Sequence, residues 1–154
     1  MFVTVFYGIL DPGTGQLTYA NAGHNPPYLF KARPLDNSQD LVVPQGLPNT
    51  GMPLGILEEA SWEAKSIELD HGDTLIMYTD GVTEAQNLQD EFFGDQRLMA
   101  VTEDNLSTSV LSIQDAVLAA VSQFSDAGAQ CDDETLVIIK RQDFQASSVK
   151  KEQF

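Results

Sequence analysis

Basic residues are scarce in this 154-residue sequence, which has 8 Lys and Arg against 23 Asp and Glu and a formal net charge of −15. Nucleic acids and anionic membranes bind proteins through clustered Lys and Arg. We therefore expect neither as a partner, and cations are the natural ligands of so acidic a chain. The single cysteine, Cys131, excludes a disulfide framework and a cysteine-rich zinc site, and it fits a reducing compartment.

Long apolar runs are missing as well. No stretch approaches the roughly eighteen residues that span a bilayer, and residues 1–4 lack the basic start of a signal peptide. We therefore expect a soluble, cytoplasmic chain. What the sequence does contain is 42% hydrophobic residues and eight Phe, enough to build the core of one domain.

Strand and turn patterns dominate the sequence up to residue 79. Residues 2–10 are rich in β-branched and aromatic side chains, and the turn sequence DPGTG at 11–15 predicts a hairpin with the strand that follows. The prolines of residues 24–27 predict a loop. Further strands are expected at residues 28–30, 41–43, 62–69 and 74–79, the last two forming a second hairpin through a turn at 71–73.

Helical periodicity appears later in the chain. Apolar residues recur at three- and four-residue steps from Ile113 to Phe124, which predicts an amphipathic helix with Ser112 as its N-cap. A shorter helix is expected over residues 95–103 and a final strand over 135–140. The sequence thus predicts an α+β fold with antiparallel strands, then helices, then one last strand.

Two acidic segments flank predicted buried strands. Asp80 follows the apolar run 75–78 in GDTLIMYTDGVTEAQN, and Asp132 and Asp133 precede the final strand in QCDDETLVII. If these two strands are antiparallel neighbours, the end of one lies beside the start of the other, and Asp80 and Asp132 converge. Paired carboxylates repel unless a cation lies between them. Mg²⁺ and Mn²⁺ accept carboxylate ligands and can hold a hydroxide that attacks phosphorus.

Each acidic segment also has a plain structural interpretation. Asp-Gly after a strand is a common turn signal, and DDET is typical of a solvated loop whose side chains cap backbone amides. The polar, irregular sequence VTEAQN after Gly81 argues against a simple hairpin turn. His24 is likewise open between a general acid and a structural loop histidine, with the structural role favoured.

Several segments, taken in order, resemble one family, the metal-dependent PPM-type (type 2C) serine/threonine phosphatases, in their bacterial SpoIIE/RsbU-like branch. The resemblance covers most of the chain and is carried by VTVFYGILDPGTGQLTYANAGHNPPYLF, GMPLGI, GDTLIMYTDGVTEAQN, FFGDQRL and CDDETLVIIK. It implies a PPM-like α-β-β-α sandwich. A lone TDG would be a weak signal, but this ordered set is specific.

The resemblance also implies a chemistry. Asp80 and Asp132 match the aspartates that bind the catalytic Mg²⁺ or Mn²⁺ pair, and Asp133 is expected beside the ligands without binding metal itself. The implied reaction is hydrolysis of phosphoserine or phosphothreonine by a metal-activated water. The implied substrate is a regulatory phosphoprotein, for instance an anti-sigma-factor antagonist.

One departure from the family pattern limits these expectations. The family's G-D-x-x-G-[KH]-G motif, which supplies further metal ligands, is not found in this sequence. We therefore expect residues 1–142 to be the C-terminal part of a catalytic domain, here truncated, with a sensor or receiver domain upstream, and residues 143–154 to be a flexible tail.

A truncated catalytic domain is expected to be weakly active or inactive on its own. Its exposed edge strands would favour self-association into a homodimer. The alternative function is a non-catalytic pseudo-phosphatase that serves as a regulatory protein-binding module.

Overall fold

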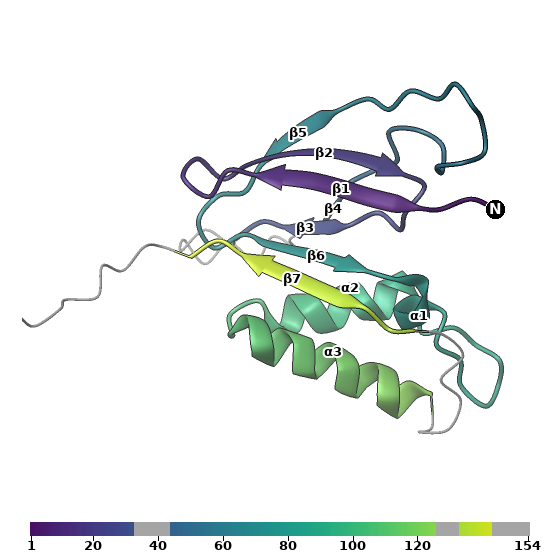
Figure 1. Cartoon of the computed structure of the whole chain (residues 1–154). Coiled ribbons are helices and arrows are strands. Elements are labelled where there is room, and N and C mark those ends of the chain that lie inside the picture. The colour runs from purple at the N-terminus through teal and green to yellow at the C-terminus, as the bar shows by residue number, and fades with distance from the viewer. Residues whose placement is uncertain (33–43, 126–132, 143–154) are drawn as a thin grey trace, which may run out of the picture.

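The computed structural model describes residues 1–32, 44–125 and 133–142, and in this part of the chain two antiparallel sheets and a layer of helices are stacked (Figure 1). One sheet has the strand order β1-β2-β5, formed by β1 (Val5–Leu10), β2 (Gln16–Ala22) and β5 (Lys65–Glu68). The other has the order β4-β3-β6-β7, formed by β4 (Gln45–Gly46), β3 (Tyr28–Phe30), β6 (Thr74–Tyr78) and β7 (Leu136–Lys140). The predicted α+β class is confirmed.

The first predicted hairpin is confirmed. Strand β1 pairs with β2 from Val5 opposite Ala22 to Leu10 opposite Leu17. The turn needs a glycine at its end, because Gly15 has φ +81° and a Cβ there would lie 2.3 Å from the carbonyl oxygen of Leu69. The DPGTG sequence therefore closes the hairpin and also lets the chain pass close to the end of β5.

The second predicted hairpin is wrong. Strand β5 pairs with β2, with Gln16 opposite Glu68, whereas β6 lies in the other sheet between β3 and β7. Residues 69–73 therefore carry the chain from one sheet to the other, and Leu69 is buried at the crossing. The turn residues at 71–73 gave the right break between strands but carried no information about which strands pair. Strand β4 was not predicted, and the strand expected at 41–43 lies outside the described residues.

Three helices occur in the described residues, α1 (Asp80–Thr83), α2 (Gly94–Asn105) and α3 (Val110–Phe124). The predicted N-cap of α3 is wrong by three residues. The hydroxyl of Ser109 accepts a hydrogen bond from the backbone N–H of Ser112 at 3.1 Å, so Ser109 is the cap and Ser112 lies in the first turn. The predicted apolar face is confirmed, since Ile113, Val117 and Val121 are buried.

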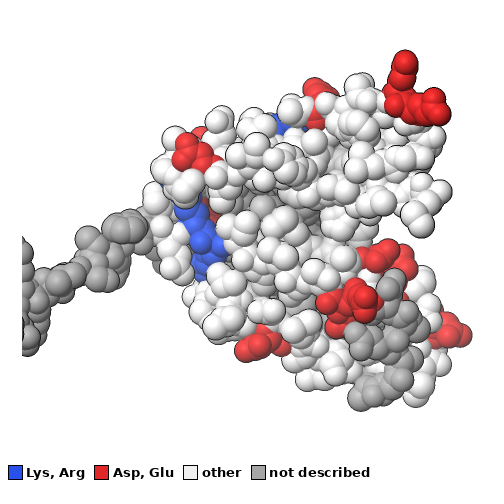
Figure 2. Space-filling view, in the orientation of Figure 1, with Lys and Arg blue, Asp and Glu red and all other residues white. Residues whose placement is uncertain are grey.

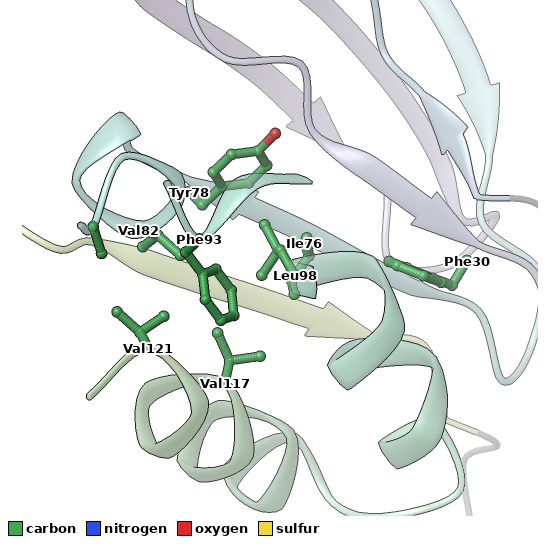
Figure 3. Close-up of a cluster of buried hydrophobic side chains, with 9 residues drawn as sticks. Phe30, Ile76, Tyr78, Val82, Phe93, Leu98, Val117 and Val121 are labelled. Atoms are coloured by element: carbon green, nitrogen blue, oxygen red, sulfur yellow. The ribbon is translucent and has the colours of Figure 1, made fainter. Parts of the chain in front are cut away.

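Two hydrophobic clusters hold the layers together. One lies between the sheets and includes Leu17, Leu29 and Leu75. The other lies between the four-stranded sheet and the helices, where Ile76, Leu98 and Val117 meet in Figure 3. Each such side chain contributes roughly 1.5–3 kcal/mol when fully buried. The predicted sandwich is therefore present with helices against one of its sheets.

The outer face of the three-stranded sheet differs from the inner one. Tyr7 and Ile9 of β1 are 63% and 61% exposed, and among the described residues no helix covers them (Figure 1). None of the helices in the described ranges has the length and apolar character needed to cross a bilayer.

Candidate functional site

Strands β6 and β7 bring the two acidic segments together in the backbone. They pair antiparallel, with Tyr78 opposite Leu136, so the end of β6 lies beside the start of β7. Thr79 continues this contact beyond the ladder, because its N–H donates to the carbonyl of Thr135 at 3.1 Å. The condition on which the predicted convergence rests, antiparallel neighbouring strands, is therefore met.

Asp80 lies directly after this junction and is the first residue of α1. The Asp-Gly pair thus starts a helical turn and does not reverse a hairpin. Gly81 and Val82 are buried behind it, and Val82 belongs to the core cluster, so the backbone that carries Asp80 is well anchored. The carboxylate itself is exposed, and its Oδ1 accepts a hydrogen bond from the N–H of Gly81 at 3.1 Å.

Asp132 lies outside the described residues, so its convergence with Asp80 stays a prediction. The neighbouring Asp133 is described and exposed, and its backbone carbonyl accepts a hydrogen bond from the Thr79 hydroxyl at 2.9 Å. The backbone one residue from Asp132 therefore lies beside the residue that precedes Asp80.

The donor chemistry fits Mg²⁺ or Mn²⁺ as part of a site. An exposed carboxylate is a ligand that these hard cations prefer. However, within residues 1–32, 44–125 and 133–142 no group of three or more His, Cys, Asp or Glu side chains is placed to hold a metal ion. The described residues thus offer a partial ligand set.

The end of β6 is also fixed to the helical layer. The hydroxyl of Tyr78 donates to Oδ1 of Asp95, in the first turn of α2, at 2.6 Å, and the Tyr78 ring stacks on Tyr28 with centroids 6.0 Å apart. Burial first, and then the hydrogen bond to Asp95, raise the pKa of the Tyr78 phenol well above its ordinary value. Tyr78 is therefore a neutral donor that holds the strand end in place.

Charge is distributed unevenly around this junction. Figure 2 shows a band of Lys and Arg side chains at the end of the molecule where β7 ends and a smaller basic group at the top of the view, whereas the charged side chains in view around α1 are acidic. A local excess of negative charge favours the approach of a cation.

The loop that contains His24 is organised by a buried asparagine. The side chain of Asn21 accepts a hydrogen bond from the N–H of His24 at 2.9 Å and donates to its carbonyl at 3.1 Å. These contacts involve the His24 backbone, so they account for the loop and leave the role of the imidazole as a prediction.

Sequence reasoning missed Thr79. Its hydroxyl joins the two acidic segments, and the available signal was a Thr at the last position of a predicted strand, directly before the candidate ligand. Its hydrogen-bonding partner lies 54 residues further along the chain, at Asp133, and no sequence pattern connects the two.

Comparisons with known proteins agree with this fold. The model of the family "Stage II sporulation protein E (SpoIIE)" matches residues 1–142. Protein IcfG of Synechocystis is 36% identical over 92% of this chain, and the phosphoserine phosphatase RsbU of Bacillus subtilis is 27% identical over 92%. The chain spans 21% and 39% of the lengths of these two relatives.

The fold is also similar to that of a solved structure. The SiaA-PP2C domain of Pseudomonas aeruginosa superimposes with a TM-score of 0.66 at 20% identity, covering 82% of this chain and 47% of that one. The fold is that of the PP2C, or PPM-type, phosphatase class. Within that class, the chain belongs to the SpoIIE family, in its SpoIIE/RsbU-like branch.

Proposed function

We propose that this chain is part of a metal-dependent protein serine/threonine phosphatase that hydrolyses phosphoserine or phosphothreonine in a regulatory phosphoprotein. The observation that carries the proposal is the family match over residues 1–142 together with the junction of β6 and β7, where Asp80 lies next to the segment that leads to Asp132. A curated relative is a phosphoserine phosphatase by name, which supports the same reaction.

In this proposal Asp80 and Asp132 are the catalytic residues of the chain and bind Mg²⁺ or Mn²⁺. The metal, when bound, supplies an activated water for attack on the phosphorus. The chain's own contribution is to hold two carboxylates at one edge of the sheet, on a backbone fixed by the core and by Tyr78. Asp133 helps to order the segment through its backbone carbonyl.

The remaining ligands would come from outside residues 1–142, which we propose to be the C-terminal part of the catalytic domain. An upstream sensor or receiver domain and an anti-sigma-factor antagonist as substrate belong to the same proposal. The 154-residue chain on its own would then have weak activity or none.

The alternative function is a non-catalytic protein-binding module. It is based on the sequence of residues 1–154, in which the family's G-D-x-x-G-[KH]-G motif, a source of further metal ligands, is not found. A pseudo-phosphatase would keep the fold for contact with a partner and would show no turnover in any length of the protein.

The two functions are separated by an assay of phosphate release from a phosphoserine peptide with Mn²⁺, for the full-length protein and for residues 1–154. We expect Asp80→Asn and Asp132→Asn each to lower kcat at least about 100-fold. Loss of a residue that only supports a metal ligand costs up to about 100-fold, and loss of a ligand itself should cost at least as much. Asp115→Asn, an exposed acid on α3, is the matched control and should leave kcat unchanged. Activity that survives both ligand substitutions would remove the metal assignment, and a full-length protein without turnover would favour the binding module.

A further inference from the structure

Strand β1 is an edge of the three-stranded sheet, with one row of backbone groups that β2 does not use. In the described part of the chain β2 is its one strand partner, and β1 forms the front edge of its sheet in Figure 1. The N–H of Asp11, just after β1, donates to the carbonyl of Gln16 at 2.9 Å. Backbone groups alternate in direction along a strand. The odd-numbered residues of β1 therefore direct these groups towards β2, whereas those of Phe6, Gly8 and Leu10 face away from it.

The sequence of β1 lacks the features that usually keep an edge strand from pairing with another chain. Charged side chains and very short edge strands are two such features. Residues 1–10 contain no Lys, Arg, Asp or Glu, although the chain has 8 basic and 23 acidic residues. The other outer strands of the described residues differ: β5 carries Lys65 and Glu68, β7 ends in Lys140, and β4 is only two residues long. Among these strands, β1 is therefore the long, uncharged edge.

The outer face of β1 is also apolar. Val3, Tyr7 and Ile9 recur at even spacing on this face and are all exposed. The surface along β1, in the middle of the view in Figure 2, is uncharged. Two copies of a chain with a net charge of −15 repel each other, so contact is favoured where neither copy brings charge. A second copy of this chain brings the same uncharged edge and therefore suits β1 as a partner.

We propose that two copies of this chain associate through β1, which pairs antiparallel with β1 of the partner subunit about a twofold axis at Tyr7. The two three-stranded sheets then form one continuous sheet. A twofold contact uses the same surface on both copies. In this register Tyr7 lies opposite Tyr7 of the partner subunit, Val5 lies opposite Ile9, and the free groups of residues 6 and 8 are paired. A register centred on Gly8 would instead place Asp11 opposite Val5, a charged side chain against an apolar one.

Sedimentation velocity of the 154-residue chain in a buffer with EDTA tests the association. From about 1 µM to 1 mM, the range of weak complexes, the wild-type mass should rise from that of one chain to that of two. Tyr7→Lys should raise the dissociation constant at least about tenfold, because it places like charges directly opposite each other at the twofold axis. General charge repulsion predicts the reverse, since a lysine makes the chain less negative. Val137→Lys adds the same charge at an exposed apolar position of β7 and should change the dissociation constant less than about twofold.

Cysteine cross-linking tests the register, in a Cys131→Ser background so that the introduced cysteine is the only one. Tyr7→Cys places two cysteines opposite each other in a pair without mutual hydrogen bonds, where Cα atoms lie about 4.5 Å apart and a disulfide can form. The two copies of Ile9 are four residues apart along the paired strands, roughly 14 Å, which is too far for a disulfide. With oxidised glutathione, Tyr7→Cys should therefore give covalent dimers and Ile9→Cys should not.

The outcomes are independent of the proposed function, because no measurement uses phosphatase activity or a metal ion. A chain that stays monomeric over the whole concentration range overturns the association. A dimer that Val137→Lys weakens as much as Tyr7→Lys does overturns the assignment to β1. A dimer in which Tyr7→Cys cross-links no more than Ile9→Cys overturns the antiparallel register. If Tyr7→Lys prevents folding, Ile9→Lys adds a charge at the next exposed position of the same face and is subject to the same criteria.

Discussion

The two ends of β6 carry acids in opposite environments. Asp73, directly before the strand, is 1% exposed, and its carboxylate accepts hydrogen bonds from the N–H of Ala32 at 2.7 Å, the N–H of Asp70 at 2.8 Å and the ammonium of Lys31 at 2.8 Å. Asp80, two residues after the strand, is exposed. The hydrogen-bonding capacity of Asp73 is used by the fold, whereas the carboxylate of Asp80 is accessible to a ligand from solution.

Among the substitutions considered, that of Asp73 is expected to lower stability the most. Asp73→Ala should lower the free energy of unfolding by about 3 kcal/mol, because two backbone amides and the partly exposed ammonium of Lys31 lose their acceptor. Asp80→Ala, at an exposed position, should change it by less than about 0.5 kcal/mol. Urea denaturation of both variants measures the difference. Equal losses would show that Asp80 is also a structural acid.

The next prediction concerns the hydrogen bond between Tyr78, at the end of β6, and Asp95 of α2. Tyr78→Phe removes the hydroxyl that donates to Asp95 and should cost about 1 kcal/mol of unfolding free energy, the usual net value of one hydrogen bond. Tyr7→Phe is the matched control, since Tyr7 is 63% exposed and its variant should behave like the wild type. A Tyr78→Phe protein as stable as this control would mean that the contact between β6 and α2 does not depend on the hydroxyl.

The sequence predicted the parts of this comparison that are local. The apolar run 75–78 marks a buried strand, and the polar sequence after Gly81 correctly indicated that Asp-Gly does not reverse a hairpin. The position of Asp80 after this run marked it as a candidate ligand, and the family resemblance pointed to the same residue. Neighbouring residues were enough for these predictions, because strand and turn propensities act over a few residues.

The parts that failed depend on distant partners. Asp73 looked like a turn residue beside His71, and its structural role requires Lys31, which lies 42 residues earlier. The second hairpin failed for the same reason, since β5 is paired with β2. The cap predicted at Ser112 was wrong because the start of the helix, at Val110 after the cap Ser109, is set by backbone geometry that the apolar periodicity does not report. The partnership of Asp80 with Asp132 stays a prediction.

The smallest expected effect is on the pH dependence of stability, and it concerns Asp70, the exposed acid that also pairs with Lys31. The hydrogen bond and positive charge of Lys31 hold the pKa of the Asp70 carboxyl below its ordinary value of 3.8. Because the folded state favours the charged form, this contribution to stability is present above pH 3.8 and is lost as the pH falls through the lower folded-state pKa.

Asp70→Asn should therefore flatten the acid limb of a plot of unfolding free energy against pH, and the variant and wild type should converge at the lowest pH. The Asp70 side chain is 65% exposed, so about 1 M NaCl should shrink its contribution, while the effect of Asp73→Ala, at 1% exposure, should persist in salt. Urea denaturation across this pH range, with and without salt, measures both. An acid limb of the same slope in wild type and Asp70→Asn would contradict the role of Lys31 at Asp70. A salt effect of equal size at both aspartates would remove the distinction between the exposed and the buried partner of this one lysine.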